Sequence, residues 1–342
     1  MRRDVFNAVD GLSAQHSLGE IPQARMKQIS IGRAHVPAFT LHTTDPTGNV
    51  DLESPDIVLA AVDTLLARRY GGDYGDASRW LLSSLFEDVA RAFRGEYPGL
   101  LRCDTHYHDL RHALDACLAM ARLIDGYSVS AGASAEAVLT ADQAVLGVAL
   151  ALTHDIGLLR KTDEADLEGA SLTPIHERRG VNFMKQYLAK TTLTALAPHA
   201  ELIMITRLDF HMRPEWQPWE KALASLLGAA DLMSQLSDRC YLEKCRDFLF
   251  VEFSAIGLTG PGNPYPDQET LLRKTPAFYT GLLRKRIEDE YSHADRFMAA
   301  HFGGECPYTQ AIERNFSYLD TILGNEDFSR LRRHPQRVID GK

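Results

Sequence analysis

From residue 54 onward, apolar residues recur at helical spacing, and the alternating pattern of strands is almost absent after residue 50. Ser54 and Pro55 supply an N-cap and a first-turn proline for the first helix, which ends at Gly71-Gly72. The same periodicity, with turn signals between segments, predicts further helices at 76–93, 108–125, 140–153, 174–189, 192–207, 216–237, 239–255, 276–301 and 307–323. The pattern therefore predicts an all-α, multi-helix bundle.

The first 50 residues lack this helical period, because their apolar residues are scattered. We expect an extended or partly disordered arm at 1–50, with one short strand around Ile29–Leu41. The arm either lies over the body or a partner subunit or is a disordered tail. Residues 51–325 are predicted to form a single all-helical catalytic domain, and residues 326–342 a solvated tail.

Composition limits the classes of function. Hydrophobic residues are 45% and charged residues 24% of the 342 residues, which suffices for a large buried core. No run approaches the roughly 20 apolar residues of a membrane helix, so we expect no membrane partner. The formal charge of −9 argues against a large nucleic-acid footprint. Five irregularly spaced cysteines and an amino terminus without an apolar stretch predict reduced thiols and a cytoplasmic location.

The strongest local signal is the stretch Tyr107-His108-Asp109-Leu110-Arg111-His112-Ala113-Leu114-Asp115. His108 and His112 are four residues apart, so on a helix both project from one face. One imidazole can then bind a metal while the other reaches a substrate. Taken alone, such a pair is equally compatible with an ordinary surface or core position.

Two further signals place acids in apolar surroundings. His154 and Asp155 follow an apolar run at 144–152, and Asp231 lies among small and apolar residues at 226–232. Burying a carboxylate is costly unless a cation or hydrogen bonds compensate it. A buried His–Asp hydrogen bond or a salt bridge to an arginine is the alternative to a metal at each position. Because one ion would account for all of these groups, we predict a divalent metal site made by His112, His154, Asp155 and Asp231.

The order His, then His-Asp, then Asp on a helical scaffold resembles the HD-domain metal-dependent phosphohydrolase superfamily. Residues 107–115 are similar to the signature of class I 3',5'-cyclic-nucleotide phosphodiesterases, which reads Tyr-His-Asn, two residues, His-Ala, one residue, Asp. Asp109 replaces the asparagine, and Glu252-Phe253 is similar to a Glu-Phe-Phe stretch of that family. The resemblance covers roughly residues 100–255 and is confined to motifs. It implies an HD-type helical bundle and a phosphodiester hydrolase.

The resemblance also implies roles for individual residues. His108 would be the general acid, and His112, His154, Asp155 and Asp231 would be ligands of the first metal, with Asp155 bridging to a second. The implied cofactors are two divalent ions, from Zn, Mg, Mn or Fe, and the implied substrate is a cyclic nucleotide or another small phosphate ester. Asp109, or an acid elsewhere such as Glu252, would orient the second ring nitrogen of His108.

Two histidines downstream are further candidate ligands. Other HD-domain proteins complete a second or third metal site with histidines after the His-Asp pair, which makes His176 and His211 candidates here. Ordinary hydrogen bonds in a first helical turn are the alternative for His176, and Asp209 competes with His211 as a ligand.

The sequence departs from the phosphodiesterases at two places. Ile156-Gly157 follows His154-Asp155 where that family continues into a second histidine and Pro-Gly, and the stretch 278–283 lacks the purine-binding glutamine. The exact substrate therefore stays open, as does dimerisation. Two other functions also fit an HD domain, namely a di-iron oxygenase and a degenerate regulatory or binding module. His108 favours the hydrolase, because an oxygenase has no evident use for it.

Overall fold

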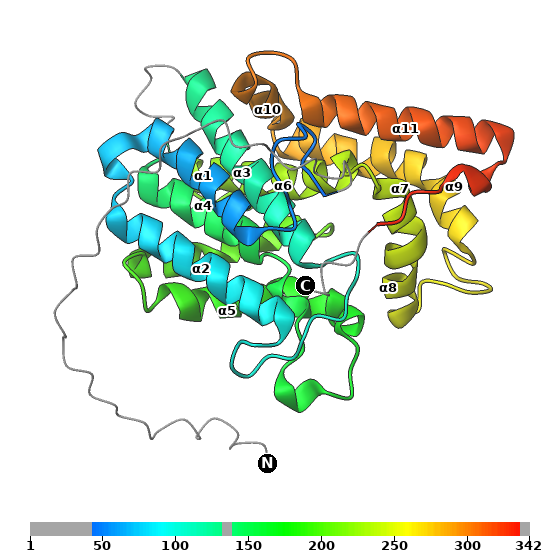
Figure 1. Cartoon of the computed structure of the whole chain (residues 1–342), viewed down its shortest axis with the longest axis horizontal. Coiled ribbons are helices and arrows are strands. Elements are labelled where there is room, and N and C mark those ends of the chain that lie inside the picture. Colours follow the sequence, from blue (N-terminus) through cyan, green and yellow to red (C-terminus); the bar gives the residue numbers. More distant parts are fainter. Residues whose placement is uncertain (1–42, 132–138, 336–342) are drawn as a thin grey trace, which may run out of the picture. The chain divides into compact units, whose positions relative to one another are not determined.

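Helices follow one another from Pro55 onward in the computed structural model, which describes residues 43–131 and 139–335 (Figure 1). The chain divides into a short unit, Met1–Ala38, and a compact unit, Phe39–Lys342. The predicted strand at Ile29–Leu41, most of the predicted arm and the end of the predicted tail lie outside the described residues. The described residues contain isolated β-bridges but no strand. The prediction of an all-α multi-helix bundle is confirmed.

The elements that build the body are mainly α-helices of three to six turns. The longer ones are α1 (Pro55–Tyr70), α2 (Asp76–Arg94), α3 (Leu110–Ala131), α4 (Ala141–Thr153), α5 (His176–Leu188), α6 (Pro218–Ser237) and α11 (Pro307–Asn325). The shorter ones are α7 (Tyr241–Lys244), α8 (Phe250–Ala255), α9 (Gln268–Phe278) and α10 (Asp295–His301). Six segments of the described residues are 3₁₀-helical, namely η1 (Gly71–Asp73), η3 (Ile156–Leu158), η4 (Thr162–Glu164), η5 (Gly169–Ile175), η6 (Thr194–Thr206) and η10 (Phe328–Arg330). Three are π-helical turns, namely η7 (Cys245–Leu249), η8 (Tyr279–Leu283) and η9 (Arg286–Glu290).

Two predicted helices differ from the structure. The segment predicted at 192–207 is the 3₁₀-helix η6, and Pro198 inside it lacks the N–H that a continuous α-helix needs. The segment predicted at 276–301 starts earlier, because the Asp267 side chain accepts a hydrogen bond from the N–H of Thr270 and caps α9. That segment also breaks at Ser292 and His293, whose φ angles are +52° and +57°, before α10 begins.

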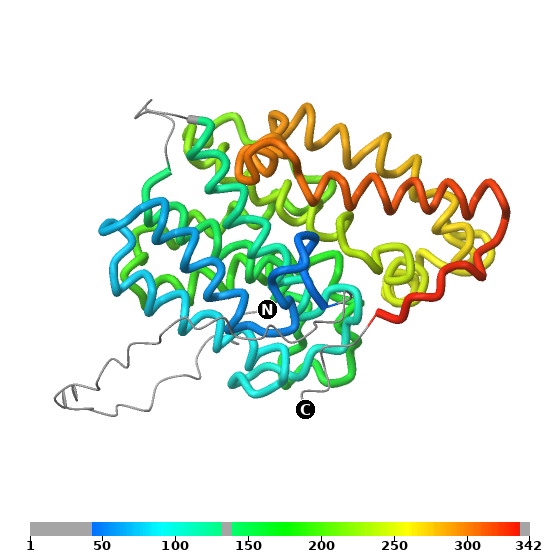
Figure 2. The backbone as a smooth tube through the Cα atoms, turned by 45° about the horizontal axis from the view of Figure 1, so that its top comes forward, coloured from blue at the N-terminus to red at the C-terminus, as the bar shows by residue number. Residues whose placement is uncertain are grey.

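Helix α3 lies at the centre of the packing, where it contacts α1, α4, α6 and α10. Figure 2 shows α10, in orange, against α3. The two helices approach closely because Gly126 has no side chain, since a Cβ there would lie 1.7 Å from the carbonyl oxygen of Phe297. Helix α4 is buried on every side, as its continuous apolar run predicts. Helices α3, α4 and α6 thus form the interior from which the candidate site is built.

No helix of the described residues has the length and apolar character that spanning a membrane requires. No disulfide joins any two cysteines of this part of the chain.

Candidate metal centre

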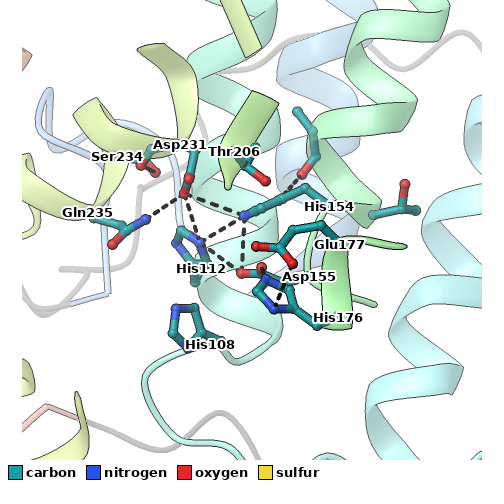
Figure 3. A network of polar contacts seen from close by, with 12 residues as sticks. His108, His112, His154, Asp155, His176, Glu177, Thr206, Asp231, Ser234 and Gln235 are labelled. Carbon is teal, nitrogen blue, oxygen red and sulfur yellow. Dashed lines mark hydrogen bonds and ion pairs between the residues drawn. The ribbon is translucent and has the colours of Figure 1, made fainter. Parts of the chain in front are cut away.

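Four side chains from three helices meet at one point in the interior (Figure 3). His112 lies in the first turn of α3, His154 ends α4 and is followed by Asp155, and Asp231 lies within α6. Asp109 caps α3, because its Oδ1 accepts a hydrogen bond of 2.9 Å from the N–H of His112. This cap explains why an aspartate can stand at the position where the phosphodiesterase motif has asparagine: both residues cap helices well.

The ligand atoms of these four residues lie within hydrogen-bonding distance of one another. Nε2 of His112 is 3.2 Å from Asp155 Oδ2 and 3.3 Å from Asp231 Oδ1. Nε2 of His154 is 3.0 Å and 3.4 Å from the same two oxygens. The two Nε2 atoms are 3.1 Å apart. The structure therefore brings together the four residues that the sequence predicts as ligands, and His112, His154 and Asp155 satisfy the spacing of a metal site.

Hydrogen bonding at the rim of the cluster fits a cation between these atoms. His154 Nδ1 lies 2.8 Å from the carbonyl oxygen of Ala151, so Nδ1 carries a proton and Nε2 is available as a ligand. Two imidazole Nε2 atoms 3.1 Å apart repel each other unless a proton or a metal ion lies beside them. Asp155 Oδ2 is buried and lies between the Nε2 atoms of His112 and His154. Two nitrogen and two carboxylate oxygen donors suit a borderline to hard divalent ion.

The pKa values of the cluster show that its imidazoles and carboxylates stabilise one another's charged forms. Burial disfavours a charged His112, but hydrogen bonds to Asp155 and Asp231 outweigh burial and raise the pKa of His112 to about 9. Burial likewise opposes a charged His154, yet the charges of the two aspartates raise its pKa well above the usual range. Burial favours neutral carboxyls, but the cationic His154 lowers the pKa of Asp155 and of Asp231. A divalent ion at these atoms would have to displace the protons that the raised pKa values of His112 and His154 favour.

Asp155 reaches a third histidine with its other oxygen. Oδ1 of Asp155 lies 3.2 Å from Nε2 of His176, while Oδ2 faces His112 and His154. His176 begins α5, and its Nδ1 lies 2.7 Å from the carbonyl oxygen of Thr173, which leaves Nε2 as the free donor atom. The two oxygens of Asp155 thus face different imidazoles, which is the arrangement a bridging carboxylate needs.

Gly157 allows His176 to come this close. A Cβ at Gly157 would lie 1.9 Å from the carbonyl oxygen of His176, so η3 and the start of α5 could not pack together with any larger residue there. Ile156-Gly157 is where the sequence departs from the phosphodiesterase motif. In this chain the departure places a histidine from the next helix beside Asp155.

His108 lies next to the cluster and is oriented by Glu252. Its ring centroid is 5.8 Å from that of His112 and 6.5 Å from that of His176. Nδ1 of His108 is 2.6 Å from Glu252 Oε2, and Glu252 Oε1 accepts from the N–H groups of His106 and Tyr107. Burial raises the pKa of Glu252, but the charge of His108 and these hydrogen bonds outweigh burial and lower it. The ionised Glu252 therefore accepts from Nδ1–H and leaves Nε2 of His108 for another partner.

His211 is not part of the cluster, which corrects its prediction as a ligand. Its side chain is 81% exposed, and its Nδ1 lies 3.3 Å from Glu290. The competing candidate Asp209 is also exposed and forms an ion pair with Arg207. The cause is in the loop after η6, where the buried Arg286 donates hydrogen bonds to the carbonyl oxygens of residues 205, 207, 208 and 210 and holds the loop against η9. Only His176 of the two downstream candidates joins the site.

A cleft of about 390 Å³ opens at the cluster. His108, Asp155, His176 and Asp231 line its polar end. The rest of its wall is largely apolar and includes Leu232, Leu236, Leu249, Phe253, Ile256, Phe278 and Leu283. Three of the predicted ligands, Asp155, Asp231 and His176, and the predicted general acid His108 thus line a space large enough for a small organic molecule.

Three residues of the site were not found from the sequence. Glu177 is buried beside His176, and its Oε2 has no hydrogen bond within the described residues. Gln235 donates to Asp231 Oδ1 and accepts from the Tyr107 hydroxyl, which holds Asp231 in place. Arg207 lines the cleft and lies 3.6 Å from Glu177. The acid directly after His176 was the one available signal, because Gln235 and Arg207 match no metal-ligand spacing.

Comparison with known proteins found one similarity. Residues 161–299 match the family model described as Npun_R2479-like. The matched part contains His176, Asp231 and Glu252, whereas His108, His112 and the His154-Asp155 pair precede it. Neither the curated proteins nor the solved structures contain a match.

Proposed function

We propose that this protein is a metal-dependent phosphohydrolase with His108 as its general acid. One observation carries the proposal: the donor atoms of His112, His154, Asp155 and Asp231 converge in a buried cluster beside a histidine that a carboxylate orients. Buried acids and imidazoles at this density are costly without a cation, and the cluster opens into a cleft. The resemblance of the sequence motifs to those of HD-domain phosphohydrolases supports the same function.

The residues divide between two ion positions. His112, His154, Asp231 and Oδ2 of Asp155 would hold the first ion, and Oδ1 of Asp155 with His176 would hold the second. Glu177 is a further buried carboxylate beside this position, with its Oε2 3.4 Å from Nδ1 of His176. When bound, divalent ions would activate a water for attack on phosphorus and offset the negative charge of the phosphoryl oxygens.

The His108–Glu252 pair would supply the proton for the leaving group. Glu252 accepts a hydrogen bond from Nδ1–H of His108 and fixes the orientation of the ring. Nε2–H of the charged ring would then donate to the leaving oxygen at the mouth of the cleft. A positioned general acid typically contributes about 10²–10⁴-fold to such a step.

The cleft suggests the kind of substrate. Its apolar wall, including Phe253 and Phe278, would exclude water and contact the organic part of a phosphate ester. A cyclic nucleotide, another nucleotide or a different small phosphate ester fits this description. We therefore propose that the substrate is a small phosphate ester and that the enzyme is a phosphodiesterase of cyclic nucleotides or related nucleotides.

The test is turnover that depends on metal. The protein, purified without added metal, is analysed for Zn, Mn, Fe and Mg, and its hydrolysis of bis(4-nitrophenyl) phosphate and a nucleotide panel is measured with and without a chelator. We expect bound divalent metal and hydrolysis that the chelator abolishes and the metal restores. A protein with stoichiometric metal and no hydrolysis of any ester would contradict the proposal.

A second function has a specific observation in its favour. His176 and the buried Glu177 enlarge the polar set to three imidazoles and three carboxylates, which also suits a di-iron oxygenase. Iron content with oxygen consumption would support that function, whereas hydrolysis under anaerobic conditions would support the hydrolase. A metal-free protein of full thermal stability would favour a regulatory module in place of either enzyme.

A further inference from the structure

A second cavity, of about 430 Å³, is lined by none of the four predicted metal ligands. It lies where the loop at 44–48 meets the first turns of α3, the end of α6 and the middle of α11. Figures 1 and 2 show this loop, in dark blue at the start of the described chain, beside α3 and α6. Nothing in the proposed hydrolysis uses this cavity.

Cationic side chains dominate the lining. Four guanidinium groups face the cavity, those of Arg111, Arg239, Arg314 and Arg333. Guanidinium is the group that proteins use most for planar recognition of phosphate and carboxylate oxygens. Four of them around one space are costly through mutual repulsion unless anions compensate them.

The carboxylates of the cavity do not supply that compensation, because buried cations already neutralise two of them. Asp238 pairs with Arg111 at 2.5 Å and with Lys244 at 2.6 Å. Asp45 pairs with Arg122 at 2.7 Å and also accepts hydrogen bonds from backbone N–H groups of its own loop. Among the described residues, neither of these two carboxylates pairs with Arg239 or Arg314.

The third carboxylate, Asp115, is 4% exposed, and burial raises its pKa to about 7 despite the opposing charge of Arg111. Near neutral pH it carries only part of a negative charge. Its Oδ1 has no hydrogen-bond partner in the part of the chain that the structure describes.

Two of the arginines are free to bind a ligand. Within residues 43–131 and 139–335, no ion pair engages Arg239 or Arg314. The guanidinium of Arg333 donates to the carbonyl oxygen of Arg239 and stacks over Tyr318, and the backbone N–H of Arg333 donates to the buried Glu243. Arg111 is 4% exposed, yet its Nε has no hydrogen-bond partner among the described residues. A buried donor without a partner in a cationic cavity is best explained by a ligand that accepts from it.

We propose that this cavity binds a small phosphate-bearing anion with at least two negative charges. Arg239, Arg314 and Arg333 would contact its oxygens, and Arg111, held by Asp238, would form the floor of the site. A single phosphate would leave most of a 430 Å³ space empty, so a diphosphate or an organic phosphate fits better. The site is separate from the metal centre, and the proposal does not depend on the hydrolase.

The test is diphosphate binding to the full chain, measured by isothermal titration calorimetry. Arg239→Gln with Arg314→Gln removes two exposed guanidiniums, and Arg296→Gln is the single-charge control on the surface of α10, outside the cavity. Each lost charge-assisted bidentate contact should weaken binding about tenfold, so we expect at least a tenfold rise in Kd for the double variant and less than about twofold for the control. Thermal melting checks that each variant is folded.

A third variant, Asp155→Asn, distinguishes the cavity from the proposed metal centre, where diphosphate would also bind metal. Binding that survives in Asp155→Asn and is lost in the double arginine variant supports the proposal. Binding lost in Asp155→Asn but kept in the double variant overturns it, as does an absence of binding to the unmodified protein. An equal loss in Arg296→Gln would show general charge attraction only and would also overturn it.

Discussion

Asp155 is the residue on which the candidate metal centre depends most. It is 4% exposed, and its two oxygens lie 3.0–3.2 Å from the imidazoles of His154, His112 and His176. Asp155→Asn keeps the shape of the side chain but removes its charge and one acceptor oxygen. We expect the variant to lose both ion positions, because Asp155 is the only residue that faces both groups of ligands among the described residues.

The size of the effect follows from these contacts. Loss of a hydrogen-bonding partner behind a metal ligand already lowers metal affinity about 10–100-fold. Loss of a ligand itself should cost at least about 100-fold, or about 2.8 kcal/mol. In the metal-free protein, the change breaks a buried ion pair, which costs about 3–5 kcal/mol of stability.

The assay combines metal content with thermal stability. Wild-type protein and Asp155→Asn are dialysed against a buffer of fixed free metal, and bound metal and Tm are measured with and without added metal. The control is Asp209→Asn, which removes an acid from the same cleft whose side chain is 69% exposed. We expect metal to raise the Tm of the wild type and of the control but not that of Asp155→Asn. Wild-type metal content in Asp155→Asn would refute the reasoning.

The remaining predictions concern the general acid and the dependence of metal binding and stability on pH. The His108→Ala variant should keep its metal but hydrolyse an alkyl ester about 10²–10⁴-fold more slowly. Its hydrolysis of a nitrophenyl ester should slow far less, because nitrophenolate leaves without a proton whereas an alkoxide needs one. Glu252→Gln should show the same pattern more weakly, and an equal loss on both esters would exclude the general-acid role. Metal affinity should increase with pH up to about 9, because below that pH the metal has to displace a proton from His112, whose pKa is raised to about 9. A metal affinity that does not change between about pH 6 and 9 would contradict this. In the metal-free protein, the stability from charged His112 is fully present below about pH 6.5 and is lost as the pH rises through about 9. The pKa of Asp115 is raised to about 7, so its contribution to the free energy of unfolding is greatest below about pH 4. This contribution is lost as the pH rises through about 7. Asp115→Asn should therefore raise Tm near pH 8 and leave it unchanged near pH 4, and a fall in Tm near pH 8 would show that its charge is needed.

The buried positions of His154, Asp155 and Asp231 could be predicted from the sequence for a local reason. Residues 144–152 are apolar on every side, so the segment has to be buried, and the His154-Asp155 pair at its end has to be buried with it. The position of Asp231 among small residues of α6 indicates burial in the same way. A buried charge needs compensation, and that requirement holds whatever the arrangement of the helices.

The position of His176 beside Asp155 could not be predicted in this way. His176 and His211 have equal standing as isolated histidines downstream of His154-Asp155. The close approach of η3 and α5 at Gly157 places His176 beside Asp155, whereas Arg286, about 75 residues further along the chain, holds the His211 loop away. Neither contact involves neighbours in sequence, so neither leaves a periodic signal.

The sequence by itself determined the helical class, most helix positions and the identity of the buried acids, because periodicity, caps and burial cost are properties of a short stretch of chain. Only the tertiary structure decided which carboxylate orients His108, since Glu252 lies 144 residues away and Asp109 is used to cap α3. It also decided that four arginines from separate segments line one cavity. Contacts between distant segments depend on how helices pack against one another, and packing is set by the whole interior at once.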